Sequence, residues 1–388
     1  MDFELPLETR MLKDLVRDFV DTELIPIEMT ASRGEDIAPD LLKSLQDKAR
    51  ERGLWLLHVP AELGGMGLGL LDLCVVNEEL ARSKAIPFRF NEVFGPFVDP
   101  ILIESANEDQ KQRFLLPNIR NEIRICFALT EPDAGADPAG MKTRAVRDGD
   151  HYILNGSKRF ISVAGISDYA LLYAVTDPQK GARGGISCFI VDLKAKGVSL
   201  PRRWPTMMDD APWEINLDDV RVPAANLLGE EGQGFALGQR SLTAQRLYGQ
   251  TAWSLGVARR ALEIAMDYAK VRVTFGQPIG ERQAVQFMIA DSAMDIRAMR
   301  LMIYETAWKH DRGEDIRDES YMAKIYAVEA GGRVVDRAIQ ILGGIGLSTD
   351  LPLEYFYRQI RSIRITEGAT EVLRWRLARN LMRKNSTG

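Results

Sequence analysis

The spacing of apolar residues divides the chain into three stretches. Up to residue 122, apolar positions recur at helical intervals, as from Met11 to Leu24 and from Asp40 to Arg52. From 123 to 228 the period becomes that of strands, and turn dipeptides such as Asn155-Gly156 separate the short apolar runs. From 229 to the C-terminus the helical period returns. The elements therefore follow the order α, β, α.

Within the last two stretches the pattern predicts particular elements. The middle stretch has strand candidates at 152–154, 169–175, 186–190 and 213–217. The last stretch repeats small and aliphatic residues at spacings of three and four, as from Leu255 to Ala269. We predict an α+β multi-domain fold: an N-terminal α-helical domain (1–122), a middle antiparallel β domain (123–228) and a C-terminal four-helix bundle (229–388).

Composition narrows the class of protein. The 388 residues are 46% hydrophobic and 27% charged with a net charge of -5, which fits a soluble globular protein and gives nucleic acid no general attraction. The N-terminus is acidic, and no uninterrupted apolar run of about 18 residues occurs. We therefore expect a cytoplasmic protein that does not enter a membrane.

Histidine and cysteine are scarce. The three cysteines and three histidines lie far apart in the chain, with no CxxC, HxxxH or HExxH spacing. Neither a metal site nor a disulfide framework is expected, and the low cysteine count favours a reducing compartment. If the chain is a catalyst, a carboxylate or a bound cofactor must do the chemistry.

Two segments of the middle stretch could contact a cofactor. At 127–137 a strand runs into a Pro/Gly turn, which exposes backbone N–H groups and the Thr130 hydroxyl to a planar polar ring; an ordinary tight turn is the alternative. About 25 residues later, strand alternation places Phe160 and Ser162 on one face, an aromatic plane beside a hydroxyl. Core packing is the alternative there.

Three further segments lie in the helical stretch. Arg272 and Thr274 end the first long helix and could grip a diphosphate, although an arginine there also suits the helix dipole. The glycines in 340–346 allow close approach to a phosphate or ribose, or simply stop a helix. In 364–371, Glu367 precedes a glycine between two helical stretches and is either a functional carboxylate or a solvated one.

The five segments together, in this order, resemble the acyl-CoA dehydrogenase family over nearly the whole chain. The likeness is closest in TEPDAGAD, RVTFGQP, ERQAVQFMIADSAMDI and QILGGIGL. The resemblance implies an FAD enzyme that removes the α proton of an acyl-CoA thioester with a carboxylate while the β hydride passes to the flavin, giving a trans-2-enoyl-CoA. The α, β, α order agrees with that family's architecture.

The resemblance implies a role for each matched residue. The base position falls on Glu367, and its backbone N–H helps to polarise the thioester carbonyl. Some members carry the base just before the arginine matched by Arg246, but here that position is Gln245, which cannot accept the proton. FAD contacts are implied at Phe127, Leu129, Thr130, Ala136, Phe160, Ser162, Arg272, Thr274, Phe275, Gln283, Gln340, Gly343, Gly344, Ala369 and Glu371.

Substrate contacts are implied at Ala136, Arg246, Thr366 and Gly368. Ala136 replaces the family's frequent serine near the pantetheine, and Thr366 replaces a frequent aromatic residue, which suggests a wider or more polar acyl pocket. Arg89 lies between two phenylalanines and could receive an acyl group that carries a carboxylate; an arginine stacked on aromatics for structural reasons is the alternative.

The resemblance also implies partners. Arg272 and its neighbours match residues that hold the FAD of an adjacent subunit, so we expect a homo-oligomer, a tetramer or a dimer. An electron-transfer flavoprotein is the expected electron acceptor, and the substrate places the enzyme in fatty acid metabolism. Two other hypotheses stay open: an acyl-CoA oxidase or lyase-like flavoenzyme on the same scaffold, and a catalytically silent helical assembly protein.

Overall fold

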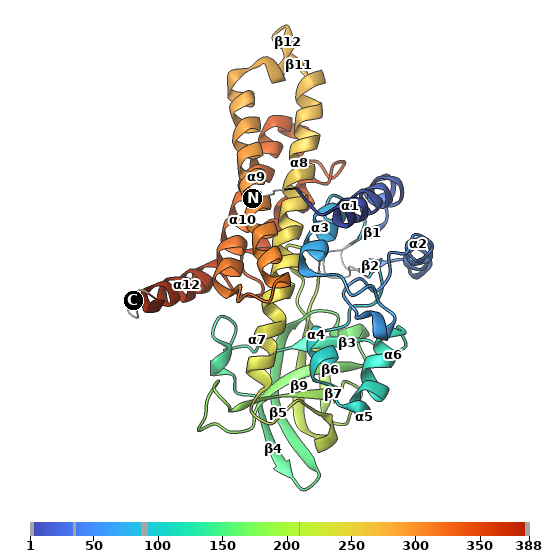
Figure 1. Cartoon of the computed structure of the whole chain (residues 1–388), viewed down its shortest axis with the longest axis vertical. Helices are drawn as coiled ribbons and strands as arrows, with labels where there is room; N and C mark the ends of the chain where they lie inside the picture. The colour runs from blue at the N-terminus through green and yellow to red at the C-terminus, as the bar shows by residue number, and fades with distance from the viewer. Residues whose placement is uncertain (1–3, 34–35, 87–91, 209, 385–388) are drawn as a thin grey trace. The chain divides into compact units, whose positions relative to one another are not determined.

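The computed structural model describes residues 4–33, 36–86, 92–208 and 210–384, which form two compact units (Figure 1). Unit 1 comprises residues 1–54, 68–90 and 243–388, and unit 2 comprises residues 55–67 and 91–242. The predicted α, β, α order is confirmed. The domain boundaries predicted after residues 122 and 228 mark the points where the period of apolar residues changes along the chain. The two units instead group segments that pack together.

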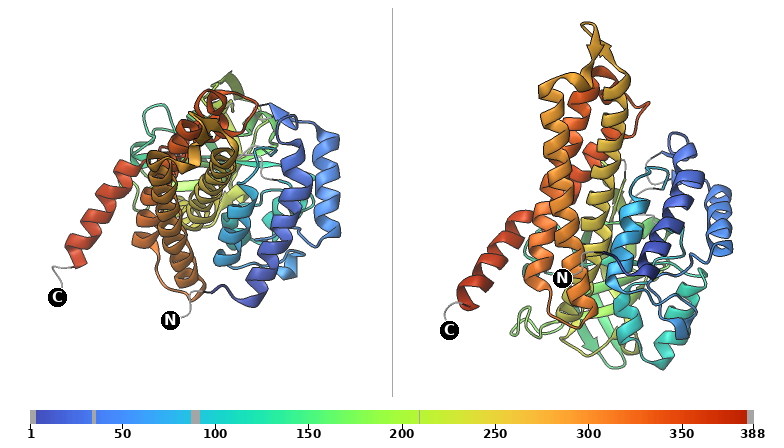
Figure 2. Two further views of the ribbon diagram at one scale, coloured as in Figure 1. Left: turned by 90° about the horizontal axis from the view of Figure 1, so that it is seen from above. Right: turned by 45° about the horizontal axis from the view of Figure 1, so that its top comes forward.

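The main body of unit 1 is an antiparallel helical bundle. Helices α8, α9, α10 and α11 run alternately up and down the bundle, as Figures 1 and 2 show. Three of the apolar residues whose spacing predicts α8 are buried: Leu255, Ala258 and Leu262. Helix α12 leaves this bundle in both figures, and Trp375 and Met382 on it are exposed.

The helices of unit 1 are α1 (Leu7–Phe19), α2 (Pro39–Glu51), α3 (Leu70–Leu80), α8 (Ala252–Val271), α9 (Gln283–Asp311), α10 (Arg317–Leu342), α11 (Leu353–Ile363) and α12 (Thr370–Lys384). Two π-helices, Val20–Leu24 and Arg246–Thr251, and three 3-10 helices, Ile25–Ile27, Ile279–Glu281 and Gly343–Leu347, accompany them. Its short strands are β1 (Ser32–Arg33), β2 (Asp36–Ile37), β11 (Val273–Thr274) and β12 (Gln277–Pro278).

Helix α3 lies directly against the backbone of α8. A Cβ placed on Gly256 of α8 would stand 2.1 Å from the carbonyl oxygen of Glu78, so only glycine permits this contact. The close approach brings Arg259, less than one turn further along α8, over the C-terminal end of α3. There it meets two consecutive carboxylates, Glu78 and Glu79, both with 0% exposure.

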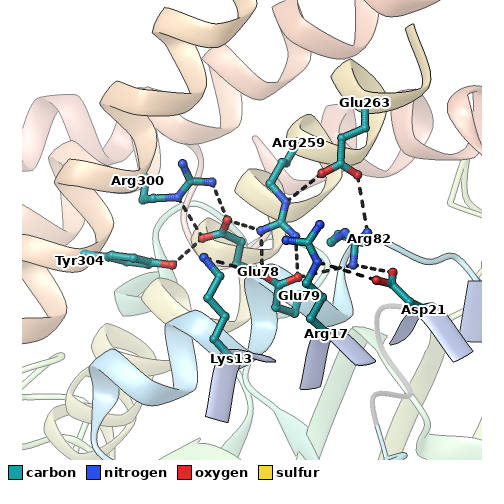
Figure 3. A network of polar contacts seen from close by, with 10 residues as sticks. All are labelled: Lys13, Arg17, Asp21, Glu78, Glu79, Arg82, Arg259, Glu263, Arg300 and Tyr304. Atoms are coloured by element: carbon teal, nitrogen blue, oxygen red, sulfur yellow. Dashed lines mark hydrogen bonds and ion pairs between the residues drawn. The ribbon is translucent and has the colours of Figure 1, made fainter. Parts of the chain in front are cut away.

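These carboxylates form the centre of a buried ionic network (Figure 3). Arg259 donates to Glu78 and to Glu79, each at 2.7 Å, and Arg300 of α9 donates to Glu78 at 2.6 Å. The hydroxyl of Tyr304 donates to Glu78 at 2.6 Å. Burial by itself would raise the pKa of Glu78, but Arg300 and Arg259 outweigh it and lower the pKa to about 2. The network ties α3 to α8 and α9.

Unit 2 is built around an eight-stranded sheet in the order β10-β7-β6-β4-β5-β9-β8, with β3 paired to β6. All four sequence-based strand candidates lie in observed strands. The sheet differs from the antiparallel expectation in two pairs, because β3 and β4 each run parallel to β6. Both faces of the sheet are buried: Leu171 and Tyr173 point into one core, Ala170 and Leu172 into the other. This explains why β6 is apolar throughout.

The strands of unit 2 are β3 (Ile125–Ala128), β4 (Arg144–Asp148), β5 (His151–Ile161), β6 (Tyr169–Val175), β7 (Ile186–Asp192), β8 (Val198–Arg203), β9 (Trp213–Pro223) and β10 (Leu227–Leu228). Its helices are α4 (Pro100–Ser105), α5 (Glu108–Gln110), α6 (Leu116–Ile119) and α7 (Gly234–Gln245), whose last residues enter unit 1. A π-helix, Lys111–Leu115, and 3-10 helices at Ala61–Leu63, Pro138–Gly140, Ala164–Ile166 and Ala224–Asn226 complete it.

Two further features concern the helices and the cysteines. In the part of the chain that the structure describes, no helix combines the length and apolarity needed to cross a bilayer. The three cysteines are free and buried.

The buried network predicts a measurable loss of stability. Glu78→Ala leaves Arg259 and Arg300 without a carboxylate they share, and breaking such a buried pair costs about 3–5 kcal/mol. Urea unfolding followed by circular dichroism measures this loss. Asp267→Ala, which removes an exposed ion pair to Lys270, is the control and should change stability by less than about 0.5 kcal/mol.

The same network predicts a pH dependence. The pKa of Glu78 is about 2 in the folded chain against its usual 4.5, so its contribution is complete above pH 4.5 and is lost as the pH falls toward 2. The stability difference between the wild type and Glu78→Ala should therefore shrink over that interval. A difference that stays constant down to pH 2 would contradict the assignment.

Candidate active site

Glu367 lies in a tight turn between α11 and α12. Its backbone φ is 51° and that of Gly368 is 103°, so two consecutive residues adopt conformations with positive φ. Glutamate rarely adopts such a conformation, which indicates that the surrounding contacts impose it. The carboxylate is half-buried, and its Oε2 is buried without a hydrogen-bond partner among the described residues. An unpartnered carboxylate oxygen of this kind is available to a ligand.

The backbone of this turn is held by two buried cations. Nε of Arg246 donates to the carbonyl oxygen of Glu367 at 2.9 Å. Nζ of Lys324, from α10, donates to the carbonyl oxygens of Thr366 and Gly368, the latter at 2.9 Å. Three consecutive carbonyl oxygens thus accept hydrogen bonds from side chains. Lys324 is 0% exposed and Arg246 5% exposed, so water does not compete for these bonds.

Burial changes the acidity of both cations. The pKa of Lys324 falls to about 7, because burial outweighs the opposing effect of Glu367. Burial likewise lowers the pKa of Arg246, against the attraction of Glu367 and Tyr321. The guanidinium of Arg246 also stands 5.7 Å from the centre of the Tyr321 ring. The site therefore combines one carboxylate with two desolvated cations.

A π-helix supplies the polar wall beside the turn. Arg246 begins it, and Gln250 on it donates to the Thr366 hydroxyl at 2.8 Å. Gln250 is 1% exposed, and among the described residues its Oε1 and the Nε2 of Gln245 are buried without partners. Single π-helical turns inside α-helices are frequent at functional sites. Sequence reasoning missed Gln250 and Lys324, because neither belongs to a motif.

The predicted cofactor segment that follows β3 is fixed by another buried lysine. Nζ of Lys158 donates to the carbonyl oxygen of Leu129 at 3.2 Å and to Glu131 at 2.8 Å. The carbonyl of Thr130 accepts from the N–H of Arg159 at 2.8 Å. A peptide plane points its C=O and N–H in opposite directions, so Lys158 turns the N–H of Thr130 away from the core. Phe127, Leu129 and Thr130 are all partly buried.

The expected arrangement of Phe160 and Ser162 on one strand face is wrong. Strand β5 ends at Ile161, and Phe160 has a φ of 59°, so simple alternation fails before Ser162 is reached. The Phe160 side chain is 52% exposed, whereas Ser162 is partly buried. Ala136 is exposed in the turn that follows β3. These residues all belong to unit 2.

The other predicted cofactor residues lie at one end of the bundle of unit 1. Because the helices alternate in direction, the end of α8, the start of α9 and the end of α10 share that end. This places Arg272, Thr274, Phe275 and Gln283 near the same level as Gln340, Gly343 and Gly344. Phe275, at the tip of the β11–β12 hairpin, is 97% exposed.

The remaining predicted residues take different positions. Ala369 is partly buried just before α12, and Glu371 is exposed in its first turn. Thr366, Gly368 and Arg246 are brought together with Glu367, as described above. Arg89 lies outside the described residues.

Family models match almost the entire chain. They are the N-terminal domain (residues 6–122), the middle domain (126–220) and the C-terminal domain (232–382) of acyl-CoA dehydrogenase. Helical segments that precede and follow a β domain along the chain, matched throughout by these models, define a flavoprotein oxidoreductase of the acyl-CoA dehydrogenase type. The chain belongs to the acyl-CoA dehydrogenase family.

Similar proteins with named functions support this family assignment. The subunit CarC of a caffeyl-CoA reductase–Etf complex from Acetobacterium woodii is 37% identical over 97% of this chain and 99% of its own. Butyryl-CoA dehydrogenase from Megasphaera elsdenii has a TM-score of 0.88 at 32% identity, covering 98% and 100% of the two chains. An FAD complex of PigA has a TM-score of 0.88 at 28% identity, covering 98% and 99%. The chain is accordingly an FAD-dependent oxidoreductase that acts on CH–CH bonds of acyl-CoA thioesters.

The residues present are compatible with FAD. In unit 2, the aromatic side chain of Phe160 is exposed, and its neighbour Arg159 donates its N–H to the carbonyl of Thr130, whose own N–H points away from Lys158. An apolar plane combined with hydrogen-bond donors suits a flavin ring, which has apolar faces and a polar edge. In unit 1, Arg272 is exposed beside the hairpin, where a guanidinium can bind a diphosphate.

The geometry of the turn predicts the effect of Gly368→Ala. The glycine has a φ of +103°, and an added Cβ would stand 3.1 Å from Cδ2 of Leu373. We expect a loss of about 1–3 kcal/mol in stability together with displacement of the Glu367 carboxylate. Thermal unfolding and the rate of acyl-CoA oxidation measure these effects.

Gly332→Ala serves as the control. This glycine is inside α10, and the nearest atom to an added Cβ is 3.9 Å away. The substitution should raise stability by about 0.5–1 kcal/mol, the usual gain for alanine in a helix. Unchanged stability and rate in Gly368→Ala would contradict the strained turn.

Proposed function

We propose that Glu367 is the base that removes the α proton of the acyl-CoA. The observation that carries this proposal is the buried Oε2, which has no hydrogen-bond partner among the described residues, on a turn whose carbonyl oxygens are bound by Arg246 and Lys324. A base needs an accessible lone pair and a fixed backbone, and Arg246 and Lys324 hold the backbone here. Gln245 cannot take the role, since an amide does not accept the proton at neutral pH.

The backbone N–H of Glu367 is proposed to polarise the thioester carbonyl. Such a donor stabilises the negative charge that develops on the oxygen when the α proton leaves, and a single donor is worth roughly 3 kcal/mol. FAD, when bound, accepts the two electrons of the β hydride. The residues of the chain supply the remaining steps: they hold the thioester, exclude water and take the proton at Glu367.

We assign FAD contacts to the residues predicted from the sequence. In unit 2, Thr130 and Ser162 would hold the edge of the ring and Phe160 would cover it. In unit 1, Arg272, Gln283 and the glycines 343 and 344 would hold the diphosphate and adenosine. Support comes from the exposure of Phe160 and Phe275, since exposed aromatic side chains gain most from a planar ligand or a partner.

The acyl pocket is proposed to be more polar than one lined by an aromatic residue. Thr366 and Gln250 already share a hydrogen bond, and Gln250 retains a buried acceptor. An acyl group with a polar or aromatic substituent fits such a wall better than a plain alkyl chain. The caffeyl-CoA reductase subunit, whose named substrate is aromatic, agrees with this preference.

The partners and setting are proposed from the same sources. We infer that an electron-transfer flavoprotein accepts the electrons, as the Etf in the name of CarC suggests. A homotetramer in the cytoplasm, acting in fatty acid metabolism, is the proposed physiological form. The exposure of Phe275, Trp375 and Met382 supports self-association, because aromatic residues and Met are enriched where protein surfaces associate.

The base assignment predicts the behaviour of Glu367→Gln. The amide retains the size of the side chain but cannot take a proton, so FAD content should be unchanged and acyl-CoA should no longer bleach the flavin. Anaerobic titration with a panel of straight-chain, branched and aryl acyl-CoA thioesters, followed at the flavin band, is the measurement. Glu314→Gln, an exposed glutamate between α9 and α10, should bleach like the wild type.

Each other hypothesis has its own result in this assay. Full bleaching by Glu367→Gln would remove the base assignment. Oxygen uptake with acyl-CoA in place of transfer to an electron-transfer flavoprotein would indicate an oxidase, and product release without bleaching would indicate a lyase. Protein that stays colourless after FAD is added would indicate a silent assembly subunit.

The proposed oligomer predicts the effect of Phe275→Ser. Replacing a side chain that is 97% exposed in the single chain should leave the fold intact but weaken both association and FAD retention. Light scattering coupled to size exclusion measures the mass, and the flavin-to-protein absorbance ratio measures FAD. Val146→Ser, at another exposed apolar residue, is the control. An unchanged mass and FAD ratio in Phe275→Ser would contradict the proposal.

A further inference from the structure

The turn that carries Glu367 depends on a residue far away in the sequence. Lys324 lies on α10, 42 residues before Thr366, and is completely buried. Its Nζ binds the carbonyl oxygens on both sides of Glu367, those of Thr366 and Gly368. A single ammonium group thus holds the carbonyl oxygens on both sides of the residue proposed as the base.

The Lys324 contacts determine where the backbone N–H of Glu367 points. The carbonyl of Thr366 and the N–H of Glu367 belong to one peptide plane and point in opposite directions. Because Lys324 draws that carbonyl toward α10, the N–H of Glu367 is directed away from α10. Arg246 donates to the carbonyl oxygen of Glu367 and thereby orients the peptide plane between Glu367 and Gly368. A turn with two positive φ values would not hold this orientation without such partners.

Burial makes Lys324 depend on its hydrogen-bond acceptors. Lys324 has two carbonyl acceptors and the nearby Glu367 carboxylate, and burial has already lowered its pKa to about 7. A desolvated ammonium persists only where acceptors replace its water. The nearest titratable groups to act on it are Glu367, which favours the charged form, and Arg246, which opposes it. Removing Lys324 leaves two carbonyl oxygens without their donor.

We propose that Lys324 is a positioning residue that orients the Glu367 carboxylate and the Glu367 N–H for removal of the α proton. The inference rests on the proposed role of Glu367 as the base. In the proposed role, Lys324 itself touches neither the substrate nor the cofactor. It acts through the peptide planes of 366–368, and its loss should slow proton removal without weakening the binding of acyl-CoA or FAD.

The test isolates proton removal from hydride transfer. Acetyl-CoA has α hydrogens but no β carbon, so it cannot be dehydrogenated. Its methyl protons can still pass to Glu367 and be replaced by deuterons from deuterated water, which proton NMR follows on the FAD-loaded enzyme. In parallel, kcat and KM are measured with the acyl-CoA that bleaches the flavin fastest.

Lys324→Met keeps the length of the side chain and removes the donor. We expect exchange and kcat to fall at least tenfold, toward the 10²- to 10³-fold loss seen when an oxyanion donor is removed, with KM and FAD content unchanged. Lys324→Arg retains a cationic donor and should recover a part of the rate. Ser320→Ala, one turn earlier on α10, removes a buried hydroxyl that donates to the carbonyl of Thr243, and should leave exchange at the wild-type rate.

Exchange in Lys324→Met within twofold of the wild type per bound FAD would overturn the inference, as would a loss that appears only in KM or FAD content. If Lys324→Met does not fold, Lys324→Gln takes its place. Its shorter side chain cannot reach both carbonyls, so a tenfold loss is again expected and a wild-type rate overturns the inference. Glu367→Gln tests the proposed base itself. Undiminished exchange of the acetyl-CoA methyl protons in this variant would refute the proposed function.

Discussion

The burial of two adjacent carboxylates, Glu78 and Glu79, is the constraint on which unit 1 depends. Burial raises the pKa of Glu78, and Arg300 and Arg259 outweigh that effect only where α3, α8 and α9 meet at one level. Gly256 makes that approach possible by letting α8 contact the backbone of α3. Once α8 is fixed, the π-helix that precedes it is fixed as well. That π-helix carries Arg246 to the turn of Glu367.

A common device recurs in both units. In each, a fully buried lysine binds backbone carbonyl oxygens of a loop proposed to contact substrate or cofactor: Lys324 at Thr366 and Gly368, and Lys158 at Leu129. Burial lowers the pKa of both lysines, to about 7 and about 8 respectively. Side chains that hold carbonyl oxygens from behind leave the N–H groups directed outward. Such N–H groups are suited to bind the partial negative charges of carbonyl and ring oxygens.

The arrangement fits the family's chemistry and suggests how this member departs from others. The carboxylate is placed by backbone contacts, so the side chains lining the acyl pocket are free to vary. Thr366 and Gln250 form a polar pair beside the turn of Glu367, in the lining proposed for the acyl group. Differences in substrate among members of one fold are expected from such lining residues.

The sequence by itself determined the order of elements, the strands of the sheet, the bundle helices and the position of Glu367 between two helices. These follow from local periodicity and from motifs that are contiguous in the chain. It did not reveal the parallel pairing of β3 and β4 with β6, the positive φ of Phe160, or the roles of Lys324 and Gln250. An isolated lysine within α10 carries no local signal, because its acceptors lie 42 and 44 residues further on. Only folding brings the lysine and its acceptors together. Lysine usually lies at the surface, but here it is buried and holds the turn that carries Glu367.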